Sequence, residues 1–267
     1  MKKLLTLLAL TLSFSMNAQW AYPGGNWAMH AQTSTATGDH AVAMGNNTTA
    51  SGSRSTSMGN QTTASGNNST TMGYFTTASG NKTTAMGANT TASDYASLVI
   101  GQFNSSGSSV TNNATSFNTA NTAFVIGNGT ASNAKSDAFK VMFNGDTTVS
   151  NDLTVSGDVV ISSDARLKSN IESLGSTLPK LLQIDGKSYE MKGKQKIGVL
   201  AQEIQEVFPE LVTKDDNEML AVNYQGLVPV LINALKEQDA KMKEQQIKYI
   251  EQEKRLERLE RLVASID

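Results

Sequence analysis

A 14-residue repeat constrains the fold of this chain more than any other feature. A large apolar residue followed by glycine recurs at this interval, at Met44, Met58, Met72, Met86 and Ile100. An alanine recurs at Ala50, Ala64, Ala78 and Ala92, and a second glycine at Gly38, Gly52, Gly66 and Gly80, with Asp94 in the next place. Small or apolar residues alternate with Thr, Ser and Asn, which predicts short strands and turns. One repeat cannot bury a face alone, so the pattern predicts the stacked coils of a β-solenoid.

The methionines of this repeat have two interpretations. They could form a metal-binding or oxidant-sensing ladder, or an internal stack of flexible apolar side chains that fills a narrow core. No cysteine occurs in the chain and no histidine recurs alongside the methionines, so we expect the internal stack. A coil with such small side chains inside buries little apolar surface, so a single chain should have low stability. We therefore expect it to associate with neighbouring chains.

The Val/Ala-Met/Ile-Gly step resembles the repeats in the head of trimeric autotransporter adhesins. The resemblance covers residues 36–105, which we expect to form the head. It implies a left-handed parallel β-roll built by three chains. It implies no particular ligand, so a host or surface ligand of the head stays unknown.

The first residues have the pattern of a secretory signal peptide. Met1-Lys2-Lys3 precedes an apolar run from Leu4 to Leu12, and Ala18 suits cleavage after it. We therefore expect residues 1–18 to be removed, residues 19–35 to be a linker, and the protein to be secreted or at the cell surface. No later stretch approaches the roughly 20 apolar residues that a membrane helix needs, so no transmembrane segment is expected.

Composition argues against several kinds of partner. The net charge of −2 gives no reason to expect nucleic acid, because phosphate binding needs clustered Lys and Arg. His30 and His40 do not form a convincing metal pair, and no cofactor is expected. The few carboxylates before Ser163 are too dispersed for the carboxylate pair of a glycosidase.

Residues 106–162 lack a clean 14-residue repeat and resemble a β-rich stalk or neck. Residues 138–143 alternate like a strand, and the turn signal 144–146 follows them. A second turn signal, 156–158, separates two more strand-like triplets, 153–155 and 159–161. Gly127 and Gly129 do not form a phosphate loop, because Ser132 takes the place of the third glycine.

The composition changes abruptly at Ser163. No glutamate precedes Glu172, whereas the chain beyond it is rich in Glu, Lys, Leu and Gln. Ser163 and Lys168 place a hydroxyl and an amine five residues apart at this boundary. They suit a Ser/Lys pair that cuts the chain, or only a turn and a helix entry.

The segment 163–224 predicts a small α+β domain. We expect a short helix at 177–184, a strand at 187–191, a helix with Leu200, Ile204 and Val207 on one face, and a hairpin at 211–222. Pro209 ends the second helix.

Residues 225–267 predict a long helix with a heptad repeat. One core position holds Leu235, Met242, Tyr249, Leu256 and Val263, and the other holds Leu231, Gln238, Gln245, Gln252, Leu259 and Ile266. Polar core layers restrict register and strand number, so we expect a parallel coiled coil of three chains. The alternative is a single exposed amphipathic helix.

Three motifs in order carry a second resemblance: Ser-Asp-x-Arg-Leu-Lys-x-Asn-Ile from Ser163, Ile-Gly-Val-Leu-Ala-Gln-Glu-Ile from Ile197, and Leu-Ala-Val-Asn-Tyr from Leu220. Residues 163–240 are similar to the C-terminal intramolecular chaperone and auto-processing domain of endosialidase-type phage tailspikes and tail fibres. The resemblance implies a domain that assembles a trimer and then cuts itself off between Ser162 and Ser163. Ser163 would be the nucleophile and Lys168 its general base.

This chemistry has geometric and electrostatic requirements. A spacing of five residues suits neither one face of a helix nor one face of a strand, so the chain must bend near Asp164, which can cap a turn. A lysine acts as a base only where burial or nearby cations lower its pKa, and Arg166 is close in sequence. We expect a self-cleaving serine endopeptidase with no other catalytic activity. The alternative is an uncleaved structural or tail-fibre-like protein whose C-terminal domain is a permanent trimerisation module.

Overall fold

The computed structural model describes residues 29–30, 33–215 and 218–265. The predicted signal peptide and residues 19–28 of the predicted linker lie outside the described residues, as does the heptad residue Ile266. The chain divides into two compact units, with the boundary between Val159 and Val160.

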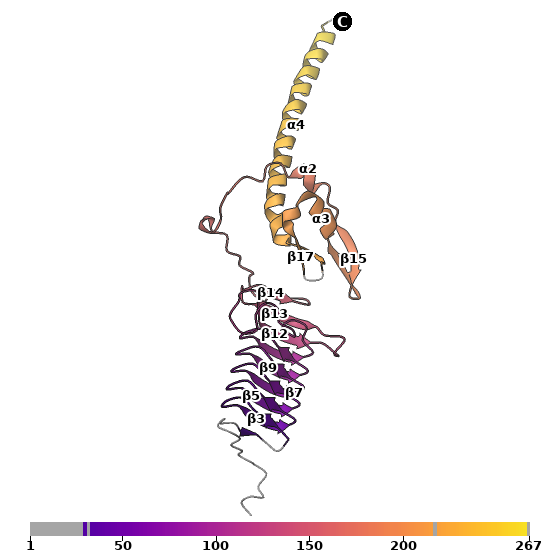
Figure 1. Ribbon diagram of the computed structural model, residues 1–267. Coiled ribbons are helices and arrows are strands. Elements are labelled where there is room, and N and C mark those ends of the chain that lie inside the picture. The colour runs from indigo at the N-terminus through magenta and orange to yellow at the C-terminus, as the bar shows by residue number, and fades with distance from the viewer. Residues whose placement is uncertain (1–28, 31–32, 216–217, 266–267) are drawn as a thin grey trace, which may run out of the picture. The chain divides into compact units, whose positions relative to one another are not determined.

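The first unit is a parallel β-solenoid, seen in Figure 1 as a stack of equivalent strands. Its larger sheet contains, in spatial order, β1 (Met29–His30), β3 (Val42–Asn46), β5 (Thr56–Asn60), β7 (Thr70–Tyr74), β9 (Thr84–Ala88), β11 (Leu98–Gln102), β12 (Thr122–Asn128), β13 (Asp137–Met142) and β14 (Thr147–Val149). A second sheet contains β2 (Thr35–Ala36), β4 (Thr49–Ala50), β6 (Thr63–Ala64), β8 (Thr77–Ala78) and β10 (Thr91–Ala92). Met44 pairs with Met58 and Met58 with Met72, so each coil advances by one predicted repeat. The solenoid prediction is confirmed.

Left-handed backbone at two corners turns each coil. One corner lies at His40, Arg54, Asn68, Lys82 and Ala96, and the other at Asn47, Gln61, Phe75, Asn89 and Phe103, all with positive φ. Such a conformation is uncommon for residues other than glycine and occurs mostly at turns. Because both corners recur once in every repeat, all the coils turn at equivalent positions.

The glycine after each methionine allows adjacent coils to approach closely. A Cβ on Gly59, whose φ is +122°, would lie 2.0 Å from the carbonyl oxygen of Gly73. A side chain at this position would therefore collide with the backbone of the next coil. This close approach explains why glycine occupies the position without exception from Gly45 to Gly101.

The methionines lie outside the solenoid, which corrects the prediction of an internal methionine stack. Met44, Met72 and Met86 are 43%, 39% and 36% exposed, whereas Ala43 and Ala85, their neighbours in the strands, are fully buried. Because side chains alternate across a strand, the small residue before each methionine takes the interior and the methionine takes the outer face. Small residues such as Ala50, Ala64 and Thr71 fill the interior.

A different strand pattern ends the solenoid. β12 continues the parallel stack beside β11, but β13 and β14 then follow as antiparallel strands. The buried carboxylate of Asp94 accepts hydrogen bonds from the backbone N–H groups of Thr111 (2.6 Å) and Thr122 (2.8 Å). Asp94 therefore holds the long connection between β11 and β12 instead of only filling a repeat position.

The turn predicted at 144–146 joins β13 to β14, where Gly145 N–H donates to the Met142 carbonyl at 3.0 Å. The strands predicted at 153–155 and 159–161 are absent from the described single chain. Their residues are exposed and belong to no helix or strand of the described chain.

The second unit begins with a short 3₁₀ helix, Ala165–Leu167, and continues as a small α+β fold. It contains α2 (Leu178–Leu181), the hairpin β15 (Lys187–Met191) and β16 (Lys194–Gly198), α3 (Ala201–Val207), a 3₁₀ turn (Pro209–Leu211), the hairpin β17 (Val212–Lys214) and β18 (Leu220–Val222), a 3₁₀ turn (Tyr224–Gly226) and α4 (Leu227–Val263). The predicted helix at 177–184 is shorter than expected. The predicted 187–191 strand, the helix that Pro209 terminates and the hairpin after it are confirmed.

The core of the second unit is small. Ile204, Phe208, Leu211 and Val230 are buried together, so α3 and the turn after it pack on the start of α4. Glu237 of α4 binds the start of α2: its carboxylate accepts hydrogen bonds from Ser176 Oγ at 2.7 Å and from the Thr177 and Leu178 backbone N–H groups. These hydrogen bonds lower the pKa of Glu237, the bond from Ser176 most of all.

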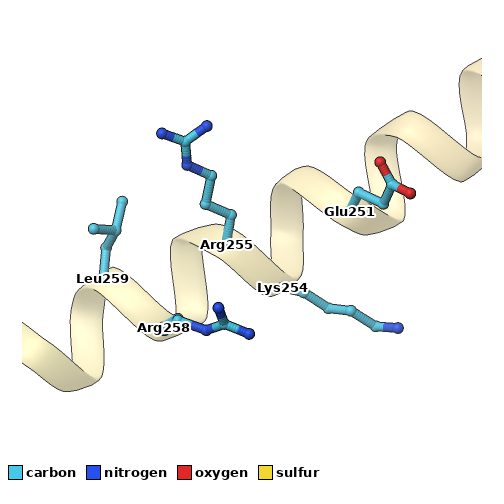
Figure 2. A pocket seen from close by; sticks show the side chains of 5 residues that line it. All are labelled: Glu251, Lys254, Arg255, Arg258 and Leu259. Carbon is cyan, nitrogen blue, oxygen red and sulfur yellow. The ribbon is translucent and has the colours of Figure 1, made fainter.

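Beyond this core, α4 has no neighbour in the described chain. The heptad residues Leu235, Met242 and Leu256 are 67%, 61% and 57% exposed. A shallow hollow lies on this helix, and all five residues that line it belong to α4, with Leu259 and Arg255 projecting from one side and Lys254 from another (Figure 2). An open hollow on one helix is not a small-molecule pocket. No helix among the described residues is long and apolar enough to cross a membrane.

Candidate functional site

Ser163 and Lys168 lie in contact. Lys168 Nζ donates a hydrogen bond to Ser163 Oγ at 2.8 Å. The chain between them turns through the 3₁₀ helix, in which the Leu167 N–H bonds the Asp164 carbonyl and the Lys168 N–H bonds the Ala165 carbonyl, both at 3.1 Å. Extended backbone on either side, at Asp164 and Lys168, aims the two side chains at each other. The bend that the spacing requires is therefore present.

Asp164 caps this turn. Its Oδ1 accepts a hydrogen bond from the Arg166 backbone N–H at 2.8 Å, which satisfies a donor at the start of the helix. The Arg166 guanidinium binds the same carboxylate through Nη2 at 2.7 Å and Nε at 3.0 Å. These bonds from Arg166 lower the pKa of Asp164, and the carboxylate raises the pKa of Arg166.

The ion pair changes the role expected of Arg166. Its charge is directed at Asp164, so it locks the turn instead of acting as a free cation beside Lys168. Ser162, Ser163 and Lys168 are all exposed in the described chain. A lysine acts as a general base where it is desolvated or lies beside a cation, and the side chain of Lys168 is exposed to solvent in this single chain.

The arrangement has the parts of an acyl-transfer site. A hydroxyl lies within hydrogen-bond distance of an amine, as a nucleophile and its base require, and the Ser162 carbonyl directly precedes it. No group of three or more His, Asp or Glu side chains that could hold a metal ion occurs among the described residues.

Two residues important for the fold were not recognised from the sequence. Asp94 was assigned only a repeat position, and Glu237 was not singled out. Glu237 bonds residues about 60 positions earlier, so no local pattern reveals it. The replacement of a repeated glycine by a carboxylate was the available signal for Asp94.

Comparison with protein families agrees with both resemblances. Residues 32–48, 36–60, 50–76 and 78–104 match the YadA head domain repeat. Residues 163–213 match the chaperone of endosialidase, a family also labelled as a peptidase, and this match starts at Ser163. The chain combines two segments, one similar to each family.

A search of the curated proteins finds no match. The head-repeat matches cover the solenoid from β2 to β11. The chaperone segment contains the Ser163–Lys168 pair, α2, the first hairpin and α3, and it ends within β17. Together the two segments support a trimeric adhesin or tail-fibre-like protein.

Proposed function

We propose that this chain is a secreted, homotrimeric fibrous protein whose chaperone segment assembles the trimer and then releases itself by cutting the Ser162–Ser163 peptide bond. The observation that carries the cleavage is the 2.8 Å contact between Lys168 Nζ and Ser163 Oγ, at the residue where the chaperone match begins. The exposed methionines of the head and the exposed heptad of α4 support the trimer, because both are ordered apolar columns that a neighbouring chain can cover.

The proposed reaction is an acyl shift followed by hydrolysis. Neutral Lys168 takes the proton of Ser163 Oγ as that oxygen attacks the Ser162 carbonyl carbon. The C–N bond between the two serines breaks, and the proton passes to the departing Ser163 nitrogen. Water then hydrolyses the resulting ester, leaving a carboxylate on Ser162 and a free amine and hydroxyl on Ser163.

The head has a physical need for such a chaperone. Its coils are equivalent, so three chains displaced from one another by a whole coil would present nearly the same side chains to one another. Non-local β pairing is also slow and prone to misassembly. The core of the second unit, with Ile204, Phe208 and Val230, occurs only once in each chain, so alignment of three such cores at the start of α4 would fix one register for the head. Removal of the aligned unit would then leave a trimer that is kinetically trapped.

Mass spectrometry of the secreted protein tests the cleavage. We expect a fragment that begins at Ser163 in the wild type and its loss in Ser163→Ala and in Lys168→Ala. Ser162→Ala is the matched control, because it keeps the proposed nucleophile and base and should still be cut. An intact wild-type chain would refute self-cleavage.

The second candidate is a protein in which the C-terminal domain stays attached as a permanent trimerisation module. The exposed heptad of α4 favours it equally, because a coiled coil needs no cut. It predicts an intact chain that is trimeric by light scattering. A monomeric intact chain would refute both candidates.

A further inference from the structure

A second repeat, six residues long, leads into the Ser163 site. Residues 141–164 divide into four units with the sequences VMFNGD, TTVSND, LTVSGD and VVISSD. Every unit ends in aspartate and has an apolar residue in its third place. The fifth place holds Gly145, Asn151, Gly157 and finally Ser163. The proposed cleavage site therefore lies in the last unit of this repeat.

The backbone follows the same period. In the first unit, Asn144 and Gly145 form the turn between β13 and β14, with Asn144 Oδ1 accepting the Asp146 N–H at 3.0 Å. Bends recur at 150–151 and 156–157, the same places in the second and third units. A triplet precedes each bend: 147–149, which is β14, and 153–155, which has no assigned secondary structure.

The first two triplets have a strand partner and the last two do not. Val141 pairs with Thr147 between β13 and β14. Triplets 153–155 and 159–161 have no strand beside them in the described chain, although they are rich in residues that favour strands. Leu153, Val159 and Ile161 are 70%, 62% and 58% exposed. Exposed triplets of strand-favouring residues that have no strand partner in their own chain are suited to pair with another chain.

The composition of the repeat indicates which chain. Residues 141–164 contain four aspartates and no lysine or arginine, so they do not suit nucleic acid or an anionic membrane. A second copy of this chain carries the same triplets at the same spacing, and both families matched by the flanking segments support a trimer.

We propose that triplets 153–155 and 159–161 pair with the same triplets of two other copies, forming a neck whose register controls cleavage at Ser163. This proposal rests on the proposed trimer and deepens the proposed self-cleavage. Ser163 lies two residues after Ile161, and Lys168 donates a hydrogen bond to Ser163. When the triplets 159–161 of three chains pair, the neighbouring chains therefore come close to Ser163 and Lys168. Those chains supply the desolvation that Lys168 needs to act as a base and that the single chain lacks.

Cross-linking tests the pairing in full-length Ser163→Ala protein, in which no cut can occur. The chain has no cysteine, so a single introduced one reports unambiguously. Val155→Cys lies in the apolar third place of its unit, and Thr154→Cys, its neighbour on the opposite face, is the matched control. After mild oxidation we expect Val155→Cys to give covalent dimers at least about fivefold faster than Thr154→Cys. Equal cross-linking of the two variants in a trimeric protein would overturn the pairing.

Insertions test the control of cleavage. Repeating residues 153–158 adds one whole unit and keeps the register, so cleavage at Ser163 should remain within about twofold of the wild type. Repeating only 153–155 adds half a unit and should lower cleavage at least about tenfold, because the alternation of side chains is reversed. Equal cleavage in the two variants would overturn the control by register. A wild-type chain that is trimeric but uncut would refute the proposed self-cleavage and with it this control, while cross-linking still decides the pairing.

Discussion

The two units of this protein are ordered by different means. In the solenoid, every coil repeats the same close approaches, such as Gly59 against Gly73, and the interior holds small side chains. In the second unit, a few large residues such as Ile204 and Phe208 form a single core from segments that do not repeat. The residues of each repeat therefore specify their own coil, and all the coils have nearly the same structure. The second unit instead has one packing arrangement that occurs only once in the chain.

This difference gives the two units different roles in assembly. A repetitive structure can be lengthened by adding coils, but its equivalent coils do not specify how three chains align with one another. A structure that occurs once in each chain specifies that alignment. Both units leave an apolar column exposed in the single chain, the methionines in one and the heptad in the other. Because the two units belong to one chain, the second unit can align the three chains of the solenoid, which the solenoid cannot do alone. In the uncut Ser163→Ala protein, changes to the two units should therefore have different consequences.

The largest expected effect is that of Gly59→Ala in the solenoid. The new Cβ would lie 2.0 Å from the Gly73 carbonyl oxygen at a φ of +122°, so coils must separate. We expect a loss on the order of 4 kcal/mol in the free energy of unfolding of the head, from collision and backbone strain together. Denaturant unfolding followed by circular dichroism measures it. Gly186→Ala in the second unit, where a Cβ also meets nothing within 4 Å, is the control and should leave the stability of the head unchanged.

Ile204→Ala tests the unique core. Ile204 is fully buried among Phe208, Leu211 and Val230, and removal of its side chain should cost about 3 kcal/mol in the stability of the second unit. If that unit aligns the head, the yield of correctly assembled head should fall as well, although no head residue has changed. Ile197→Ala, at a residue 86% exposed, is the control. A normal yield of assembled head in a variant whose second unit is unfolded would show that the second unit does not align the head.

Leu256→Ala probes the heptad of α4. Its side chain is 57% exposed in the single chain, and burial in a coiled coil should contribute about 2 kcal/mol per chain. We expect the trimer to dissociate at higher concentration than the wild type, measured by sedimentation. Lys254→Ala, two residues earlier on another side of the helix, should leave association unchanged. Equal association of the two variants would show that α4 is a solitary amphipathic helix.

A smaller effect than those of the three core and heptad changes is the pH dependence contributed by Glu237. Its pKa is lowered by the hydrogen bonds from Ser176 and the backbone of Thr177, so its contribution to stability is complete above the ordinary pKa of about 4.3. That contribution is lost as the pH falls through the lowered folded-state pKa. Glu237→Gln should therefore reduce the change in melting temperature of the second unit between pH 7 and pH 3.

Glu244→Gln provides the comparison for this titration. The Glu244 carboxylate bonds Lys248 one turn along α4, so it tests the helix without α2. Its effect should be smaller, because exposed pairs of this kind contribute little. A larger effect for Glu244 than for Glu237 would contradict the proposed importance of the contact between α2 and α4.

The sequence alone determined the repetitive parts of this protein. The 14-residue period predicted the solenoid because equivalent residues must stack in equivalent places, and the heptad predicted α4 because its period matches one helical face. The bend between Ser163 and Lys168 also followed from their spacing.

Only the tertiary structure decided which face each side chain takes and which distant segments meet. The methionines were expected inside, but so short a coil has room only for small side chains, so Ala43 and its equivalents occupy the interior. Asp94 reaches Thr122, and Glu237 reaches Thr177, across separations that no local period records. The turn likewise decides that the Arg166 guanidinium contacts the Asp164 carboxylate, because Asp164 and Lys168 both lie two residues from Arg166 in the sequence.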